Sequence, residues 1–258
     1  MTAGIARLKT QATSKMSMKK ALVLLAALAV GASLYAQSDA SRSSYSITSD
    51  FTYTSKYVFR GLGLAKDSFQ PSVEVSAGNL YADIWTNLPI TKHQDDTIEF
   101  KGGYRERVGH NLTLEALGTY YWYPEAHTGL TRHSLEGGFG ATYAAAGFSP
   151  SIYYYHDFEL RSDTGEGALG YSIPLADYGT EVDLSLYGGT TRIDKLAMAP
   201  GVQVRESYNY YGADLTIPYH VSAHAKITAG VHWAASEQYL HGLGRNRYWF
   251  DIGFAAGF

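Results

Sequence analysis

The sequence predicts an all-β fold: a transmembrane, antiparallel, up-and-down β-barrel of about twelve strands, preceded by a cleaved signal peptide. Three observations predict it: apolar and polar residues alternate with period two, short and long connections alternate along the chain, and ionisable residues share one strand face. The chain of 258 residues holds 22 Tyr and 27 Gly, whereas only 17% of its residues are charged. Mean hydropathy is −0.18, far from that of a helical membrane protein. Tyr and Gly at this level suit twisted strands better than helices.

The N-terminal segment contains the one long apolar run, Ala21 to Ala36, directly after Lys19 and Lys20. A helix needs about 18 or more apolar residues to span a bilayer. A basic start, a short apolar core and small residues at the end are typical of a secretory signal instead. We expect cleavage after Ala36, with Ala40 as the second choice; a membrane anchor is the alternative interpretation.

Two segments follow from this cleavage: an N-terminal extension with its signal peptide, 1–36, and a barrel domain, 37–258. The residues before Met16 or Met18 do not resemble a signal, so Met18 is an alternative start. Removing 1–36 takes away five basic residues and no acidic ones, which moves the net charge from −3 to −8. Such a surface argues against nucleic acid as a partner. The absence of Cys excludes disulfides, thiolate metal sites and a Cys nucleophile, and we expect neither a cofactor nor a metal.

The strands are predicted from alternation alone. In 112–122, Leu112, Leu114 and Ala116 share one face, and Thr113 and Glu115 share the other. Period two is the signature of a strand. Twelve segments follow this pattern, with centres near Thr52, Val75, Ile84, Phe100, Leu117, Phe139, Tyr153, Leu169, Leu184, Leu215, Thr228 and Gly253.

The connections between these segments alternate in length. The short ones are 77–79, 106–111, 144–147, 175–180 and 220–223; the long ones are 61–70, 89–96, 124–133, 157–165, 191–207 and 234–247. Outer-membrane barrels have short periplasmic turns and longer external loops. We therefore expect the outer membrane of a Gram-negative-type bacterium, with both termini in the periplasm.

The two strand faces differ in the solvent they suit. The apolar face is expected to contact outer-membrane lipid, with the tyrosine clusters at 120–123, 153–155 and 208–211 forming interfacial girdles. The other face carries ionisable groups that cannot all be packed in a dry core. We expect this face to surround a wet lumen.

Ten acidic and five basic residues face inward by this parity. The acids are Asp50, Glu74, Asp83, Glu99, Glu115, Glu136, Glu166, Asp183, Asp214 and Asp251, and the bases are Lys56, Arg60, Lys101, Arg105 and Lys226. The residues expected to line a pore are Glu74, Asp83, Glu99, Lys101, Arg105, Glu115, Glu136, Asp183, Asp214, Lys226 and Asp251. A lining of this composition predicts a narrow porin or channel for small solutes with a cation bias.

Charge pairing within single strands refines this expectation. Glu115, Glu136, Asp183 and Asp214 have no inward base on their own strands, so we expect their charges to be uncompensated. Glu99 shares its strand with Lys101 and Arg105, and Asp50 precedes Lys56 and Arg60. These acids are expected to be neutralised.

Two alternatives remain open. Barrels of about eight strands are filled by side chains, those of about 16 carry open channels, and a barrel of twelve falls between them. The first alternative is therefore a closed structural or adhesive barrel with binding loops. An outer-membrane hydrolase with a rim His/Asp site is the second. Its candidates are His93, His127, His133, His156 and His241, with Asp95, Asp96 and Glu125 nearby. No G-x-S-x-G or H-E-x-x-H motif is present, so we predict that the chain is not an enzyme.

In the last segment, 248–258, every second residue is apolar. Its apolar set is Tyr248, Phe250, Ile252, Phe254, Ala256 and Phe258. The pattern resembles the C-terminal signal that outer-membrane barrels present to their assembly machinery, with Tyr248, Phe250, Ile252, Phe254 and Phe258 as the recognised residues. The resemblance implies the barrel assembly machinery and periplasmic chaperones as partners; the oligomeric state is not predicted.

Residues 54–61, TSKYVFRG, resemble the N-terminal strand of the TorF-type porins, a bacterial group whose function is not established. The likeness continues through 69–89, where that group also has a Pro-bearing hairpin that ends in a Tyr-x-x-x-Trp strand, and through 97–104. It is clear over about 55–105. The resemblance implies an outer-membrane barrel with a channel, and it supplies no site residues.

Overall fold

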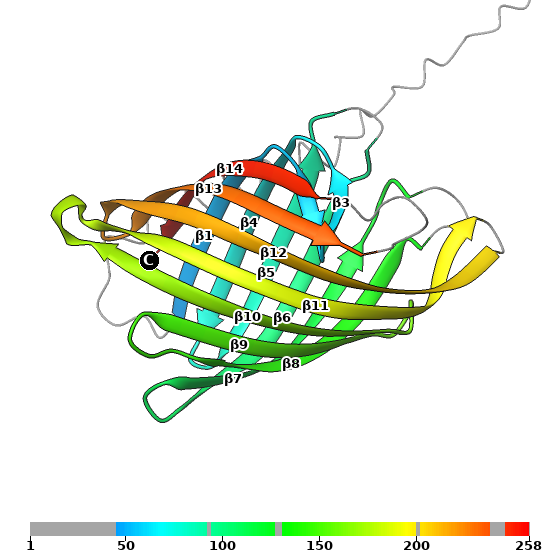
Figure 1. The fold of residues 1–258 in the computed structure, drawn as a ribbon, viewed down its shortest axis with the longest axis horizontal. Helices are drawn as coiled ribbons and strands as arrows, with labels where there is room; N and C mark the ends of the chain where they lie inside the picture. The colour runs from blue at the N-terminus through cyan, green and yellow to red at the C-terminus, as the bar shows by residue number, and fades with distance from the viewer. Residues whose placement is uncertain (1–44, 92–93, 127–130, 200–201, 238–245, 258) are drawn as a thin grey trace, which may run out of the picture.

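The barrel is closed by pairing between its first and last strands. The computed structural model describes residues 45–91, 94–126, 131–199, 202–237 and 246–257. In these residues twelve antiparallel strands form the wall, and β1 pairs with both β4 and β14 (Figure 1). The wall strands are β1 (Tyr45–Thr54), β4 (Ser68–Ala77), β5 (Leu80–Pro89), β6 (Thr97–Val108), β7 (Leu112–Trp122), β8 (His133–Tyr143), β9 (Phe148–Asp157), β10 (Ser162–Leu175), β11 (Thr180–Ala199), β12 (Val202–Ser222), β13 (Ala225–Ser236) and β14 (Arg247–Gly257).

The predicted fold class and all twelve predicted strand centres are confirmed, since each centre lies within one wall strand. The described part of the chain contains no helix with the length and apolar character needed to cross a membrane. The predicted signal peptide and Phe258 lie outside the described residues.

Both described ends of the chain lie at the end of the barrel that carries the short turns. Tyr45 is opposite Ala77, which begins the turn to β5, and Thr48 is opposite Gly257. The first strand therefore starts beside the place where the last strand finishes. The closing pair is continued by a hydrogen bond from the backbone N–H of Ser55 to the carbonyl oxygen of Phe250, at 2.9 Å.

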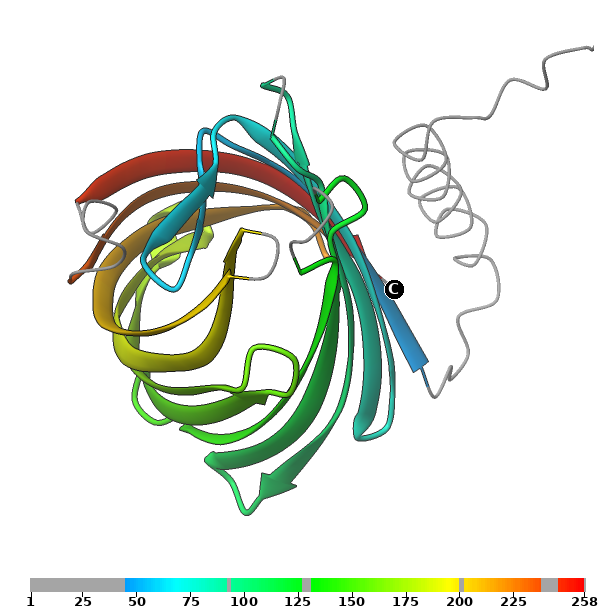
Figure 2. The ribbon, with the colours of Figure 1, turned by 90° about the vertical axis from the view of Figure 1, so that its right-hand side faces the viewer.

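A two-stranded hairpin leaves the wall after β1. It consists of β2 (Tyr57–Phe59) and β3 (Leu62–Ala65), which pair only with each other. Figure 2 looks into the barrel from the end with the long connections, where this blue-to-cyan hairpin reaches into the opening. The sequence had predicted a plain loop over 61–70.

The connection predicted over 191–207 is also wrong, because β11 continues to Ala199 and β12 starts at Val202. The pairing of Ile193 with Glu206 extends the ladder well past the predicted strand ends. Arg192 and Asp194 gave this segment the polarity of a loop, yet they form an exposed ion pair on a strand, at 3.4 Å. Ile193 and Tyr208 are buried nearby and stabilise the extended ladder.

The outer surface of the wall is apolar in every strand from β4 to β14. Exposed large side chains include Val75, Ile84, Phe100, Leu114, Phe139, Ile152, Leu169, Leu186, Leu215, Val231 and Ile252, one from each of these strands. A soluble protein rarely exposes an apolar surface of this extent. The alternation places these residues in lipid. The backbone N–H and C=O groups of the wall form their hydrogen bonds with neighbouring strands, as a lipid environment requires.

The tyrosine clusters do not lie as complete girdles. Tyr120 and Tyr154 are exposed on the outer surface, whereas Tyr121, Tyr153 and Tyr155 line the interior. The period of two splits each run of aromatics between the two faces. Only alternate members can therefore lie at a lipid interface.

Five interior tyrosines lie directly opposite a glycine on the neighbouring strand. The pairs are Tyr81 with Gly103, Tyr153 with Gly140, Tyr155 with Gly138, Tyr187 with Gly212 and Tyr210 with Gly189. A Cβ at any of these glycines would overlap the ring of the paired tyrosine. Because glycine has no Cβ, the ring of the paired tyrosine can lie against the wall. These pairs account for part of the high glycine and tyrosine content of the sequence.

We expect Gly140→Ala to destabilise the barrel by about 1–3 kcal/mol, because the new methyl group would overpack against the Tyr153 ring. Gly165→Ala is the matched control, since no atom lies within 4 Å of a Cβ at that position. Urea unfolding of both variants in lipid vesicles would measure the difference. Equal stability of the two variants would contradict the role of the glycine–tyrosine pairs.

Candidate functional site: the lumen beneath the hairpin

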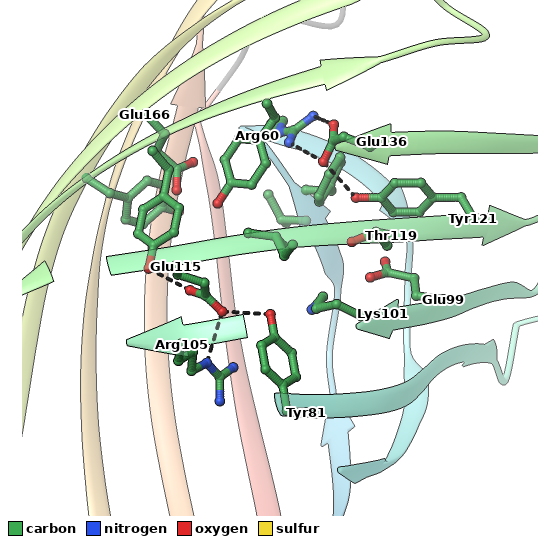
Figure 3. A pocket seen from close by; sticks show the side chains of 16 residues that line it. Arg60, Tyr81, Glu99, Lys101, Arg105, Glu115, Thr119, Tyr121, Glu136 and Glu166 are labelled. Atoms are coloured by element: carbon green, nitrogen blue, oxygen red, sulfur yellow. Dashed lines mark hydrogen bonds and ion pairs between the residues drawn. The ribbon is translucent and has the colours of Figure 1, made fainter. Parts of the chain in front are cut away.

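A chamber of about 530 Å³ lies inside the barrel beneath the hairpin (Figure 3). Its charged lining residues are Arg60, Glu99, Lys101, Arg105, Glu115, Glu136 and Glu166. Its aromatic lining residues are Phe59, Tyr81, Tyr121, Tyr153, Tyr155 and Tyr187. The hairpin supplies the ceiling, and strands from β5 to β11 supply the wall. Charges and aromatic rings therefore meet around one hollow in the lumen.

Arg60, at the tip of the hairpin, binds Glu136 of the wall. Its two terminal nitrogens donate to the two carboxylate oxygens at 2.7 and 2.9 Å. The Arg60 and Glu136 side chains are only 11% and 5% exposed. The Tyr121 hydroxyl also donates to this carboxylate, at 3.2 Å. A bidentate, charge-assisted pair of this kind fixes geometry more firmly than a single contact.

Aromatic rings complete the surroundings of the Arg60 guanidinium. Its central carbon lies 4.9 Å from the ring centroid of Tyr155 and 4.7 Å from that of Phe59. These distances are within the range of cation–π attraction. The guanidinium is thus held by a carboxylate and by two rings at once.

The hairpin is anchored on opposite sides of the lumen. Tyr57 packs against Trp85 of β5 with ring centroids 5.4 Å apart, and Leu62 packs against the buried cluster that contains Tyr210 of β12. Arg247 of β14 donates from Nε to the carbonyl oxygen of Gly61, at 3.3 Å. Anchors on β5, β12 and β14 therefore hold the hairpin over the lumen.

Gly61 is required where the hairpin turns. Its φ of +75° lies in the left-handed region. A Cβ there would lie 2.7 Å from Cβ of Tyr210 and 2.9 Å from the carbonyl oxygen of Ala235. Only glycine allows both this backbone conformation and this close approach to the wall.

Glu115 is the centre of a second network in the chamber. It accepts hydrogen bonds from the hydroxyl groups of Tyr81 and Tyr153, at 2.6 and 2.8 Å, and from Nε of Arg105, at 2.9 Å. The Arg105 guanidinium carbon lies 3.7 Å from the ring centroid of Tyr81, and the same side chain pairs with Glu74 at 3.4 Å. Glu115 is thus neutralised from a neighbouring strand.

These pairs contradict the within-strand pairing expected from the sequence. Glu136 and Glu115 are compensated by Arg60 and Arg105, although their own strands carry no inward base. Arg105 binds Glu115 and Glu74 rather than Glu99. The error has a simple cause: side chains on adjacent strands lie closer together than two residues spaced along one strand.

A third cluster of ionisable side chains joins three strands elsewhere in the lumen wall. His232 of β13 lies between Asp214 of β12 and Asp251 of β14, with its Nδ1 2.8 Å from the first and its Nε2 2.7 Å from the second. The ring stacks on Trp249, with centroids 5.0 Å apart. Asp214 and Asp251 were predicted as pore-lining residues, whereas His232 was not.

The remaining predicted lumen residues lie along the same interior. Asp83 is opposite both Glu74 and Lys101 in the strand ladders. Asp183 borders a hollow of about 360 Å³ with Ser149, Ser151 and Ser172. Lys226 borders another hollow near the short turns. Of the predicted residues, the structure brings Glu99, Lys101, Arg105, Glu115 and Glu136 together in one chamber and places Asp183 and Lys226 at separate hollows. Their part in conduction stays a prediction.

Among the described rim residues considered for hydrolysis, Asp96 meets Glu125, to which its backbone N–H donates at 3.4 Å. His133 stacks on the exposed ring of Tyr120, and His156 lies 2.8 Å from Asp163 on the outer surface. His93, His127 and His241 lie outside the described residues. Within the described ranges, no group of three or more His, Asp or Glu residues is arranged to hold a metal ion.

Sequence reasoning missed the hairpin, His232 and the tyrosine–glycine pairs. A faint signal existed for the hairpin, since Tyr57, Val58 and Phe59 precede Arg60 and Gly61 in a segment too apolar for a solvated loop. No local signal could reveal His232, because its partners lie on two other strands. To predict these features, one must know which residues of neighbouring strands lie opposite each other, and the sequence alone does not give this register.

Comparisons with known proteins support the fold. The sequence matches no protein-family model and no curated protein. The structure is similar to that of the NanC porin, with a TM-score of 0.50, 10% sequence identity and coverage of 81% of this chain and 98% of that chain. An outer membrane channel from Pseudomonas putida F1 gives a TM-score of 0.47 at 10% identity, covering 83% of this chain and 95% of that chain. The likeness to the NanC porin shows that the chain has the fold of an outer-membrane porin.

The Arg60–Glu136 pair should show strong energetic coupling. In a double-mutant cycle with Arg60→Gln and Glu136→Gln, we expect about 2–3 kcal/mol, since either single change leaves a buried charge without its partner. The exposed pair of Arg192 and Asp194 is the control and should give less than about 1 kcal/mol. Urea unfolding in lipid vesicles would measure both cycles, and equal coupling in the two would be inconsistent with a buried anchor.

Proposed function

We propose that the chain is a narrow outer-membrane channel for small water-soluble solutes, with a preference for cations. The observation that carries this proposal is the charged chamber of about 530 Å³ inside a barrel whose outer surface is apolar. A lumen filled by side chains would have no such space. The porin fold and the resemblance of residues 54–61 to the TorF-type porins support the same proposal.

The proposed preference for cations rests on the lumen carboxylates that have no arginine partner. Glu136 and Glu115 are compensated by arginines, whereas Glu166 is held by the hydroxyl of Tyr210, at 2.6 Å, which carries no charge. Asp183 borders its hollow beside serines. An unneutralised carboxylate in a narrow, low-dielectric wall concentrates cations.

The hairpin favours one alternative, a closed structural or adhesive barrel whose loops bind a partner. It reaches into the opening and is anchored to β5, β12 and β14. Conductance separates the two functions. In planar bilayers a channel gives discrete current steps, and a closed barrel gives none.

Glu166→Gln should lower the preference for K⁺ over Cl⁻ by a factor of about two at 0.1 M salt, because it removes one lumen charge and keeps an acceptor for Tyr210. The effect should shrink at 1 M salt, where the screening length falls to about 3 Å. Reversal potentials in a KCl gradient would measure it. Glu106→Gln is the control, since Glu106 binds Tyr104 and Asn79 on an exposed part of β6. A wild-type preference for Cl⁻ would refute the proposed cation bias.

The proposed orientation places the short turns and both termini in the periplasm. A cysteine at Glu159, between β9 and β10 at the end with the long connections, should react with a membrane-impermeant maleimide on intact cells. A cysteine at Asp177, in the short turn between β10 and β11, should react only after the outer membrane is permeabilised. The reverse pattern would invert the barrel.

A further inference from the structure

The lumen recognises the guanidinium group twice, with the same chemistry. Arg60 lies between the carboxylate of Glu136 and the ring of Tyr155, and Arg105 lies between the carboxylate of Glu115 and the ring of Tyr81. In both cases a tyrosine hydroxyl also donates to the carboxylate. Planar donors match a carboxylate, and a flat cation suits an aromatic face. The repeated unit is a binding site for guanidinium.

The two arginines differ in how they are attached. Arg105 belongs to β6, a wall strand whose pairing holds it in place. Arg60 belongs to the tip of a hairpin that forms no backbone ladder with the wall. Arg60 also has a φ of +48°, an unfavourable backbone conformation for a residue with a Cβ. Its site can therefore be vacated without opening the barrel.

The site has room for a solute beside it. Glu136, Tyr121 and Tyr155 border the chamber of about 530 Å³ into which Arg60 projects from above. The same chamber contains Glu99 and Glu166. A solute that enters from the chamber meets the carboxylate of Glu136 and the face of Tyr155 once Arg60 has moved away.

The geometry points to a solute site for guanidinium-bearing cations, formed by Glu136, Tyr121 and Tyr155, which Arg60 occupies as a tethered ligand. The inference rests on the proposed function and names the solute class that the lumen selects. A tethered group has a high effective concentration, so a free solute competes weakly in the wild type and binds readily when Arg60 is removed. The hairpin and the solute are alternative occupants of one site.

Chemical rescue tests the site without requiring conduction. Arg60→Ala should unfold at a lower temperature than the wild type in detergent, and about 50 mM methylguanidinium chloride should raise its midpoint by several degrees, as expected for a ligand that binds only the folded state. Tetramethylammonium chloride at the same concentration should not, because it lacks N–H donors for the carboxylate. In Arg60→Ala/Glu136→Gln the rescue should disappear. Arg60→Gln, which keeps most of the side-chain volume, is a second background for the same measurement.

Conduction provides a second measurement. In planar bilayers Arg60→Ala should show a larger unit current than the wild type, and methylguanidinium should block that current at concentrations at least tenfold lower than in the wild type. Rescue that is equal with tetramethylammonium, or that survives Glu136→Gln, would overturn the site. If no variant conducts, the proposed channel fails, while the thermal measurement still decides the guanidinium site.

Discussion

The fold depends on one constraint: in lipid, a backbone N–H or C=O group without a partner costs several kcal/mol. The pairing of β1 with β14 meets this constraint, because it gives partners to the two strands that would otherwise be edges. Closure in turn divides every strand into an outer and an inner face. The apolar exterior and the charged interior are consequences of that division. The β2–β3 hairpin lies outside the closed ladder and depends on side-chain contacts for its position over the lumen.

Much of this architecture could be predicted because its signal is local. Alternation within about ten residues was enough to locate every wall strand, including β8 around Phe139 and β10 around Leu169. The polar residues Arg192 and Asp194 concealed the long ladder of β11 and β12, because the packing of Ile193 that supports it cannot be read from neighbouring residues. The presence of a strand can be predicted from the residues of its own segment, whereas its length depends on the residues of the neighbouring strands that pair with it.

The sequence predicted which residues face the interior, but it predicted the wrong ion pairs between them. Parity identified Glu115, Glu136 and Arg105 as inward residues, and the structure places them in the chamber. Their partners come from other strands or from the hairpin, at distances set by register and barrel curvature. The lumen therefore carries far less free charge than a count of its ionisable residues indicates. Its electrostatic character comes from the carboxylates that no arginine pairs, of which Glu166 is one.

The tyrosine–glycine pairs have a further consequence for the calibre of the passage. Each ring lies flat because its partner has no side chain, so the free width of the lumen depends on residues that never touch a solute. One methyl group at Gly138 or Gly140 would displace the ring of Tyr155 or Tyr153 from its present position. Evolution can thus narrow such a barrel by a single-atom change in its wall, without altering strand number or the chemistry of the lining. Among relatives, the two members of a pair are expected to change together.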